Sequence, residues 1–387
     1  MSTRSFRLAL AVVLGTLVLL AGLSGYFVHR ALSYPGEAHA GTGADIEVEI
    51  KTGMSFPSVA STLANSGVIA KPTWFRLYAM WEGKTTQVKP GKYLLKDTAT
   101  PREVLASITE GVKEVTIRVT LPEGRTMLEF FEAIEKACPE GVAPPCPSIA
   151  RAADLEALAR DKAFLGKFAI TADTVEGHLF PDTYQFRVGE KPTVVLTRLI
   201  TRHQEVWNEL VGNHPRDTAR LKELLGWSDR DILTMASIVE KEAVEPSERP
   251  RIAQVFINRL SKAFKPRKLQ TDPTIRYGCT VPAQKSAACI AWHEPCLKAG
   301  KPMGCDRLHR AQLDDTDNPY NTYAIEGLPP GPISNPGKAS IEATLSPDGS
   351  DYFFFVATSK GSRSHAFAKT VAEHERNVQK YVGTLGD

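Results

Sequence analysis

The amino-acid sequence predicts an α+β protein that consists of an N-terminal transmembrane helix, a small module and a larger domain. Three observations support this prediction. An uncharged apolar run lies close to the N-terminus. Strand-like and helix-like patterns then follow one another within residues 45–114, and residues 115–387 mix both patterns without the regular alternation that a parallel sheet requires. A chain of 387 residues is long enough for two or three domains.

The composition excludes two classes of protein. The chain has 47 lysines and arginines against 44 acidic residues, which leaves a net charge of +3. A dedicated nucleic-acid binder usually carries a clustered basic stripe, so we expect no nucleic-acid partner. The apolar fraction of 42% is too high for a disordered chain.

The apolar residues concentrate near the N-terminus, where no residue from Leu8 to Val28 carries a charge. At about 1.5 Å per residue, a helix of this length crosses the roughly 30 Å hydrocarbon core of a bilayer. Arg4 and Arg7 precede the run and favour a cytoplasmic N-terminus. We therefore expect a single-pass protein of the cell inner membrane with its remainder on the periplasmic, extracytoplasmic side. The expected segments are a cytoplasmic tail at 1–7, a transmembrane helix at 8–28 and a linker at 29–44.

A cleaved signal peptide is the alternative for this segment. The sequence Ala38-His39-Ala40 resembles a signal-peptidase site. However, it lies well beyond the apolar run, and the run is longer than the usual signal-peptide core of about 7–15 residues. We favour an uncleaved anchor.

The six cysteines lie in two short, loop-like segments, and in an exported protein this pattern predicts disulfides. The first segment contains Cys138 and Cys146, and the second contains Cys279, Cys289, Cys296 and Cys305. A zinc site is the alternative, because His293 and His309 are interleaved with the second group. No C-x-x-C pair is present, so we predict no metal.

Residues 45–114 predict a β-α-α-β module. Residues 46–50 alternate like a strand, Ser55 caps a first helix, and a second helix carries the aromatic residues of 74–81. A turn and a strand follow, and Thr100 caps a further helix. Such a unit resembles a LysM-type glycan-binding module. We expect its aromatic side chains in the core rather than on a sugar-binding surface.

In the larger domain, 115–387, we expect a strand at 115–119 and a helix that begins after Thr126 and ends at Lys136. Helical segments follow as far as about residue 225, with residues 176–184 among them. Residues 352–358 predict a strand, and a final helix follows His365.

A helix across residues 228–245 carries the strongest chemical signal. Ser228 and Asp231 form the pattern of a capping box. On a helical projection, Glu240 falls within a broad apolar arc, and Glu242 lies at its edge. The apolar arc contains Ile232, Leu233, Met235, Ala236, Val239, Ala243 and Val244, and the opposite arc contains Thr234, Ser237, Lys241 and Glu245.

An ionised, unpaired carboxylate on a buried face is costly, so burial raises the pKa and keeps the acid protonated. A general acid needs this property, which makes Glu240 a candidate catalytic residue. The alternative is a structural ion pair with an arginine of the next helix, which Ser247 is expected to cap. The candidate partners are Arg249, Arg251 and Arg259.

Further polar and aromatic side chains suit a sugar-binding cleft. We assign a substrate-binding role to Gln270, Asp272, Tyr320, Asn321 and Tyr323. Motifs of other enzyme classes are missing: the sequence has no G-x-S-x-G and no H-E-x-x-H. Residues 331–338 depart from a nucleotide-binding loop in their glycine spacing, so we expect no cofactor.

These segments together resemble the endolytic murein transglycosylases, the YceG-like family. The matching stretches are FPDTY at 180–184, ASIVEKE at 236–242, VFINRL at 255–260, LQTDPT at 269–274, PYNTYAIEGLPPG at 319–331 and SHAF at 364–367. The resemblance covers nearly the whole chain. The segment from Cys279 to Asp315 departs from it, because it is longer and richer in cysteine than expected.

The resemblance implies cleavage between N-acetylmuramic acid and N-acetylglucosamine within nascent peptidoglycan strands. Such cleavage leaves 1,6-anhydro-muramoyl ends and would terminate strand elongation, so peptidoglycan synthases become expected partners. The family's essential glutamate falls on Glu240, with Glu242 as the second choice. A muramidase that uses water, or a membrane-tethered glycan-binding scaffold without activity, remains the alternative.

Overall fold

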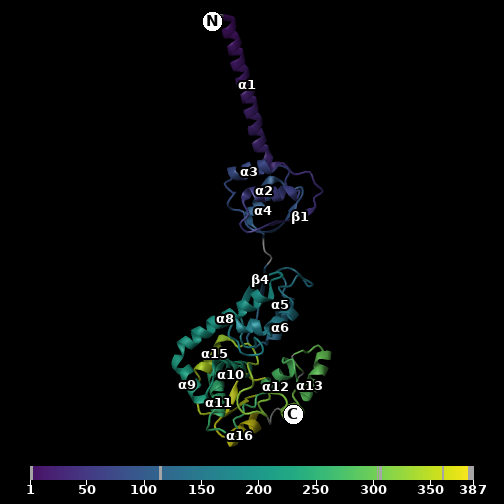
Figure 1. Ribbon diagram of the computed structural model, residues 1–387. Coiled ribbons are helices and arrows are strands. Elements are labelled where there is room, and N and C mark those ends of the chain that lie inside the picture. The colour runs from purple at the N-terminus through teal and green to yellow at the C-terminus, as the bar shows by residue number, and fades with distance from the viewer. Residues whose placement is uncertain (1–2, 113–115, 303, 305–306, 360, 382–387) are drawn as a thin grey trace. The chain divides into compact units, whose positions relative to one another are not determined.

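The structure is a computed structural model that describes residues 3–112, 116–302, 304, 307–359 and 361–381 (Figure 1). Met1 and Ser2 of the expected tail, Val115 of the expected strand, and Cys305 lie outside the described residues. Contacts divide the chain into two units, Met1–Glu114 and Val115–Asp387. Both units combine helices and strands, which confirms the predicted mixed α and β class.

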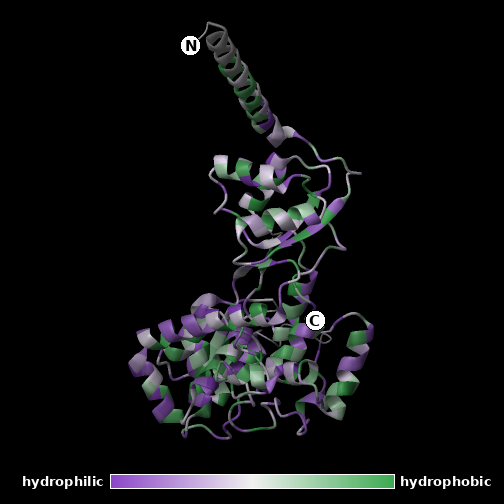
Figure 2. Cartoon of the chain, turned by 45° about the horizontal axis from the view of Figure 1, so that its top comes forward, coloured by the Kyte–Doolittle hydropathy of each residue, from purple (hydrophilic) through white to green (hydrophobic). Residues whose placement is uncertain are grey.

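The first unit begins with the long apolar helix α1 (Thr3–Ser33), which continues into a short 3-10 turn, η1 (Tyr34–Gly36). Its apolar side chains from Val13 onward are exposed. The green colour along this helix in Figure 2 marks its apolar residues. The candidate membrane span is Val13–Gly36, with a mean hydropathy of 1.4. Length and composition suit a membrane crossing, although a signal sequence shares both properties.

The rest of the first unit has the predicted strand and helix order. β1 (Asp45–Ile50) pairs antiparallel with β2 (Gly91–Lys96), and Ile46 lies opposite Leu95. Between them run α2 (Phe56–Asn65) and α3 (Pro72–Trp81), and α4 (Pro101–Glu110) follows behind the Thr100 capping box. Alternate strand residues meet the helices in one core, which includes Val48, Leu63, Phe75, Tyr93 and Val104. The likeness to a glycan-binding module stays a prediction.

The second unit opens with β3 (Thr116–Thr120) and α5 (Met127–Lys136). After α6 (Ala152–Ala159) and α7 (Lys162–Gly166), β4 (Thr183–Arg187) pairs antiparallel with β3. The expected helical assignment of residues 176–184 was wrong, because residues 176–182 form turns and loop and β4 begins at Thr183. Tyr184 and Phe186 are buried and their neighbours are exposed, which is the period-two pattern of a strand.

Helices build the centre of this unit. They are α8 (Pro192–Asn213), α9 (Pro215–Leu225), α10 (Asp229–Glu242), α11 (Arg249–Leu260) and α15 (Lys338–Leu345). α10 packs against both α11 and α15 within the main hydrophobic core (Figure 1). The short turn η2 (Pro246–Glu248) precedes α11, and the expected cap by Ser247 was wrong, since Glu248 occupies that position without a side-chain cap.

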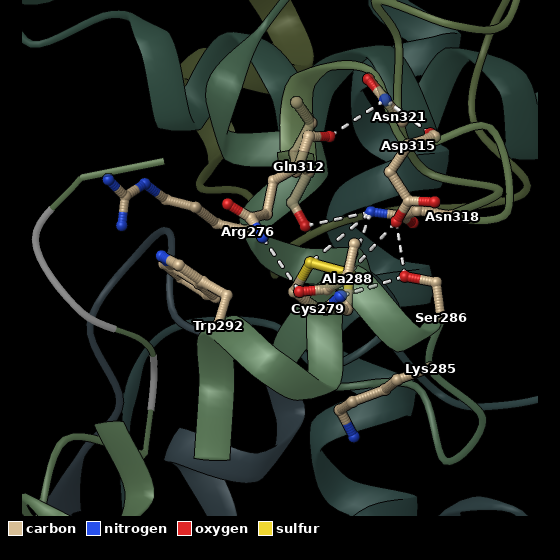
Figure 3. The surroundings of a disulfide bond; sticks show 12 residues. Arg276, Cys279, Lys285, Ser286, Ala288, Trp292, Gln312, Asp315, Asn318 and Asn321 are labelled. Atoms are coloured by element: carbon tan, nitrogen blue, oxygen red, sulfur yellow. Dashed lines mark hydrogen bonds between the residues drawn. A yellow bond between two sulfur atoms is a disulfide. The ribbon is translucent and has the colours of Figure 1, made fainter. Parts of the chain in front are cut away.

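The cysteine-rich segment folds into α12 (Asp272–Thr280), α13 (Ala287–Lys298) and α14 (Arg310–Leu313). A disulfide joins Cys279 to Cys289, and Asn318 Nδ2 lies 3.5 Å from the Cys289 sulfur (Figure 3). A second disulfide joins Cys138 to Cys146. Both confirm the disulfide prediction. His293 Nε2 donates to the Pro302 carbonyl at 2.6 Å, so this candidate zinc ligand is engaged by the backbone.

The C-terminal part contains a two-stranded sheet and a helix. β5 (Phe354–Ala357) pairs antiparallel with β6 (His365–Ala368), and α16 (Val371–Tyr381) follows. The strand expected at 352–358 is confirmed. The final helix begins later than expected, because residues 365–368 form β6.

Candidate active site

Helix α10 begins at the capping box of Ser228 and Asp231, as predicted. The first half of its polar arc, however, does not face solvent, whereas Lys241 further along is exposed. Thr234 is 1% exposed and Ser237 is fully buried, where its hydroxyl accepts the Ile333 N–H at 2.9 Å. The helix is covered on all sides along residues 232–239. Glu240 lies in the last turn of this buried helix. Its side chain is therefore surrounded by polar groups and does not lie on an apolar surface.

The carboxylate of Glu240 has two close partners. Its Oε2 accepts the backbone N–H of Gly337 at 3.1 Å, and its Oε1 lies 3.6 Å from Arg249 Nη2. Only 7% of the side chain is exposed. The predicted lone carboxylate is therefore wrong, and of the three candidate arginines Arg249 is the partner. The N–H and the guanidinium together hold the carboxylate in one orientation.

A second carboxylate, that of Glu123, shares this arginine. Its Oε2 lies 4.0 Å from the same nitrogen, Arg249 Nη2, and 47% of its side chain is exposed. Partial burial and the neighbouring Glu240 raise the pKa of Glu123, while Arg249 opposes the shift. Two acids thus flank one guanidinium, one of them enclosed and the other facing solvent. Sequence reasoning did not single out Glu123.

Asn335 holds the loops around Glu240 together. It is fully buried, and its backbone exchanges 2.9 Å hydrogen bonds with Gly124 and Arg125. Its side-chain amide donates to Glu176 Oε1 at 3.0 Å. The turn bearing Glu123 and the turn bearing Gly337 therefore lie next to each other beside Glu240. No local periodicity marks Asn335, so sequence reasoning missed it.

Gly337 offers a way to displace Glu123 without deleting it. A methyl group at Gly337 would overlap the Glu123 carboxyl, which is the movable end of a flexible side chain. The backbone of Gly337 has φ −77° and ψ 168°, which alanine adopts without strain. We expect Gly337→Ala to lower activity roughly tenfold with less than about 1 kcal/mol lost in stability. Combined with Glu123→Gln, its effect on activity should largely disappear in a double-mutant cycle, and full additivity would contradict this contact.

Glu242 points to the other side of α10, since two residues along a helix correspond to about 200°. It lines a cavity of about 570 Å³ together with Gln270, Asp272 and Tyr323. Burial raises the pKa of Glu242, and a hydrogen bond donated by the Thr271 hydroxyl opposes the shift. The structure therefore gathers three of the five predicted substrate-binding residues around the second-choice glutamate.

Two of these cavity residues are held in defined positions. Gln270 has a left-handed backbone, with φ of 56°, and its side-chain oxygen accepts from Arg259. Asp272 accepts the hydroxyl of Tyr323 at 2.9 Å. A non-glycine residue at positive φ is uncommon and is maintained only by its surroundings. The strained position and the ordered polar groups make this cavity a candidate binding site.

The remaining two predicted residues lie elsewhere. Tyr320 lines a separate cavity of about 350 Å³ with Glu176, Arg230 and Tyr277. Asn321 was assigned wrongly: it is fully buried. Its amide donates to the carbonyls of Gln312 and Asp315 (Figure 3) and to that of Leu313. Its oxygen accepts the Tyr323 N–H. With these bonds made inside the chain, Asn321 orders its own loop and is not available to a sugar.

Comparison with known proteins identifies the family. A sequence model described as the YceG-like family matches residues 48–380. The chain belongs to this family. An endolytic murein transglycosylase of Bacillus subtilis (strain 168) is 29% identical over 382 residues, which cover 94% of this chain and 92% of the relative. One of Streptococcus pneumoniae serotype 2 is 25% identical over 397 residues, or 97% of this chain and 66% of that protein.

A solved structure of the YceG-like family is also similar. The crystal structure of a yceG-like protein from Listeria monocytogenes is 28% identical in sequence and superimposes with a TM-score of 0.51. The match covers 87% of this chain and 99% of that one. The resemblance noted in the sequence is thus confirmed at the level of the family, across most of the chain.

Proposed function

We propose that this YceG-like protein is an endolytic murein transglycosylase anchored in the inner membrane, with its second unit on the extracytoplasmic side. The observation that carries the proposal is Glu240, held between Arg249 and the Gly337 N–H next to the half-exposed carboxylate of Glu123. The curated relatives are named for this activity and match nearly the whole chain. The enzyme is a lytic transglycosylase, and its substrate is peptidoglycan.

Glu240 is the proposed acid and base. In protonated form it donates to the glycosidic oxygen while positive charge develops at the muramoyl C1. Its carboxylate then accepts the proton of the C6 hydroxyl as that oxygen bonds to C1, which leaves a 1,6-anhydro ring. No water is consumed. Because the substrate supplies its own nucleophile, the attack is intramolecular and has a high effective molarity.

Glu240 is favoured over Glu242 by its partners. A backbone N–H and a guanidinium orient Glu240 beside an exposed carboxylate, whereas an oxygen of Glu242 accepts the Thr271 hydroxyl inside the adjoining cavity. We assign that cavity, with Gln270, Asp272 and Tyr323, to the binding of sugar units next to the cleaved bond. Tyr320 is a more distant candidate. A role for peptidoglycan synthases as partners stays part of this proposal, as does glycan binding by the first unit.

Glu123 is the proposed second carboxyl group of the reaction and acts in its ionised form. Its side chain is 47% exposed and its carboxylate shares Arg249 with Glu240, and from this position it would stabilise the positive charge at C1. We expect Glu123→Gln to lower the rate roughly 10–100-fold with little change in KM. Because Glu123 must be ionised and its pKa is raised, the wild-type rate should fall as the pH drops through that pKa. The Gln variant should lack this acid limb, and an unchanged pH profile would contradict the role.

The same carboxylate pair favours one alternative function, a hydrolytic muramidase. Ordinary glycosidases use two carboxyl groups, and Glu123 would then activate a water molecule. Mass spectrometry of digested, uncrosslinked glycan strands separates the two, since the anhydro product is one water lighter. Products with anhydro ends would support the transglycosylase function. Products with reducing ends would contradict it and support the muramidase function.

A further inference from the structure

The first unit exposes an apolar face on helix α3. Leu77, Met80 and Trp81 are 52%, 64% and 69% exposed, and their spacing places them on one side of the helix. The opposite side, with Phe75, Tyr78 and Ala79, is buried in the core of the unit. Such a face on a helix already packed by its other side indicates an interaction surface.

This face lies at the end of the candidate membrane span. Trp74 of α3 stacks on Phe27 of α1, with ring centroids 6.4 Å apart. Just beyond, Tyr34 is 3% exposed in the core of the unit, and its hydroxyl donates to the Lys71 carbonyl at 3.1 Å. The last turns of α1 are thus fixed to the start of α3, which lies near the end of α1 in Figure 1. If α1 crosses a bilayer, α3 lies at the bilayer surface.

The charges around α3 suit the same surface. Residues 71–84 contain three basic side chains, Lys71, Arg76 and Lys84, against one acid, Glu82. A helix with an apolar face that includes tryptophan, flanked by basic residues, is typical of helices that lie in the membrane interface. Basic residues near the surface are attracted to anionic headgroups.

We propose that α3 is an interfacial helix that docks on the bilayer crossed by α1, with Leu77, Met80 and Trp81 in the headgroup–acyl boundary. The proposal rests on the proposed membrane anchoring. The partner is a phospholipid surface rather than a glycan, because the face continues the apolar surface of α1 through Trp74 and Phe27. A second attachment would set the orientation of the first unit on the membrane, because α1 would no longer be its one contact with the bilayer.

Site-specific fluorescence on the full chain tests this proposal. Met80→Cys, labelled with an environment-sensitive dye, is reconstituted in vesicles of phosphatidylethanolamine and phosphatidylglycerol, with and without lipids brominated near the glycerol end. The control is Leu94→Cys. Leu94 is 68% exposed, but its neighbours Tyr93 and Leu95 face the helices, so it lies on the far side of the sheet. No described cysteine is free, so labelling of the unsubstituted chain sets the background.

We expect brominated lipid to quench the label at position 80 about twofold and to leave the label at 94 unaffected, since an interfacial helix buries its apolar face by about 5–10 Å. Adding Leu77→Ser and Trp81→Ser should abolish the quenching while circular dichroism stays unchanged. A protein that floats with the vesicles but is unquenched at 80, or is equally quenched at both sites, overturns the proposal. So does protection of the label by soluble glycan strands without vesicles. Failure to float would overturn the anchoring itself, and the docking with it.

Discussion

Glu240→Gln is expected to lower the rate of glycan-strand cleavage by roughly 10²–10⁴-fold, the usual contribution of a general acid and base. Glutamine has nearly the same shape and its oxygen still accepts the Gly337 N–H, so the loops around the site should remain in place. It cannot donate the proton that the leaving oxygen needs. The rate is measured on uncrosslinked strands by mass spectrometry of the anhydro products.

Glu242→Gln is the matched control, because both glutamates lie in the last turn of α10. We expect this variant to retain anhydro-product formation within roughly tenfold of wild type, with the loss in glycan affinity rather than in the chemical step. The two variants should unfold at similar denaturant concentrations. If Glu242→Gln were inactive and Glu240→Gln active, the catalytic acid would be Glu242 and not Glu240.

The second large effect is acid instability of the second unit, caused by two adjacent histidines, of which His203 is buried and His178 is partly buried. His203 is 4% exposed, and within the described residues neither ring nitrogen has a hydrogen-bond partner. Its ring lies 5.2 Å from that of His178. Burial, followed by the neighbouring His178, lowers the pKa of His203, and burial with Arg230 lowers the pKa of His178 to about 4.

The direction of the pH effect follows from these lowered pKa values. Unfolded histidine binds a proton below about pH 6.5, whereas the buried rings stay neutral, so the unfolded state binds more protons in acid. Their stabilising contribution is complete above pH 6.5 and is lost as the pH falls toward 4. At pH 5 we expect a loss of roughly 2 kcal/mol for each histidine, measured by urea unfolding followed through tryptophan fluorescence.

His203→Phe should remove about half of this pH dependence. The ring of His203 stacks on Trp207 with centroids 6.1 Å apart, and phenylalanine can keep that contact without a titrating group. His309→Asn is the control, since His309 is exposed and asparagine keeps its helix-capping acceptor. A stability that stays level between pH 7 and pH 5 in the wild-type chain would refute the assignment of neutral, buried rings.

The sequence by itself determined the elements whose signals are local. Capping residues marked the starts of α4, α5 and α10, because a cap is formed by side chains three residues apart. Strand alternation marked β1, and the helices and second strand that follow it in the sequence predicted the β-α-α-β order. The sequence also singled out Glu240 and named three candidate arginine partners, of which the structure places Arg249 beside it.

The reason given for Glu240 was nevertheless incomplete, because a helical projection assumes one buried face. α10 is packed by α11, α15 and the loop at Ile333, so Thr234 and Ser237 of its polar arc are buried as well. Two other predictions failed because they depended on contacts that local sequence patterns do not contain. β4 pairs with β3, which is distant in sequence. The amide of Asn321 donates to three carbonyls of its own loop instead of to a sugar.

Only the tertiary structure decided what surrounds Glu240. Glu123 and Gly337 lie on opposite sides of it in sequence and are brought together by the backbone hydrogen bonds of Asn335. Arg249 joins the two acids through one nitrogen. Electrostatic interactions depend on distance in space and on burial, and neither can be read from residue types when the groups come from three separate segments.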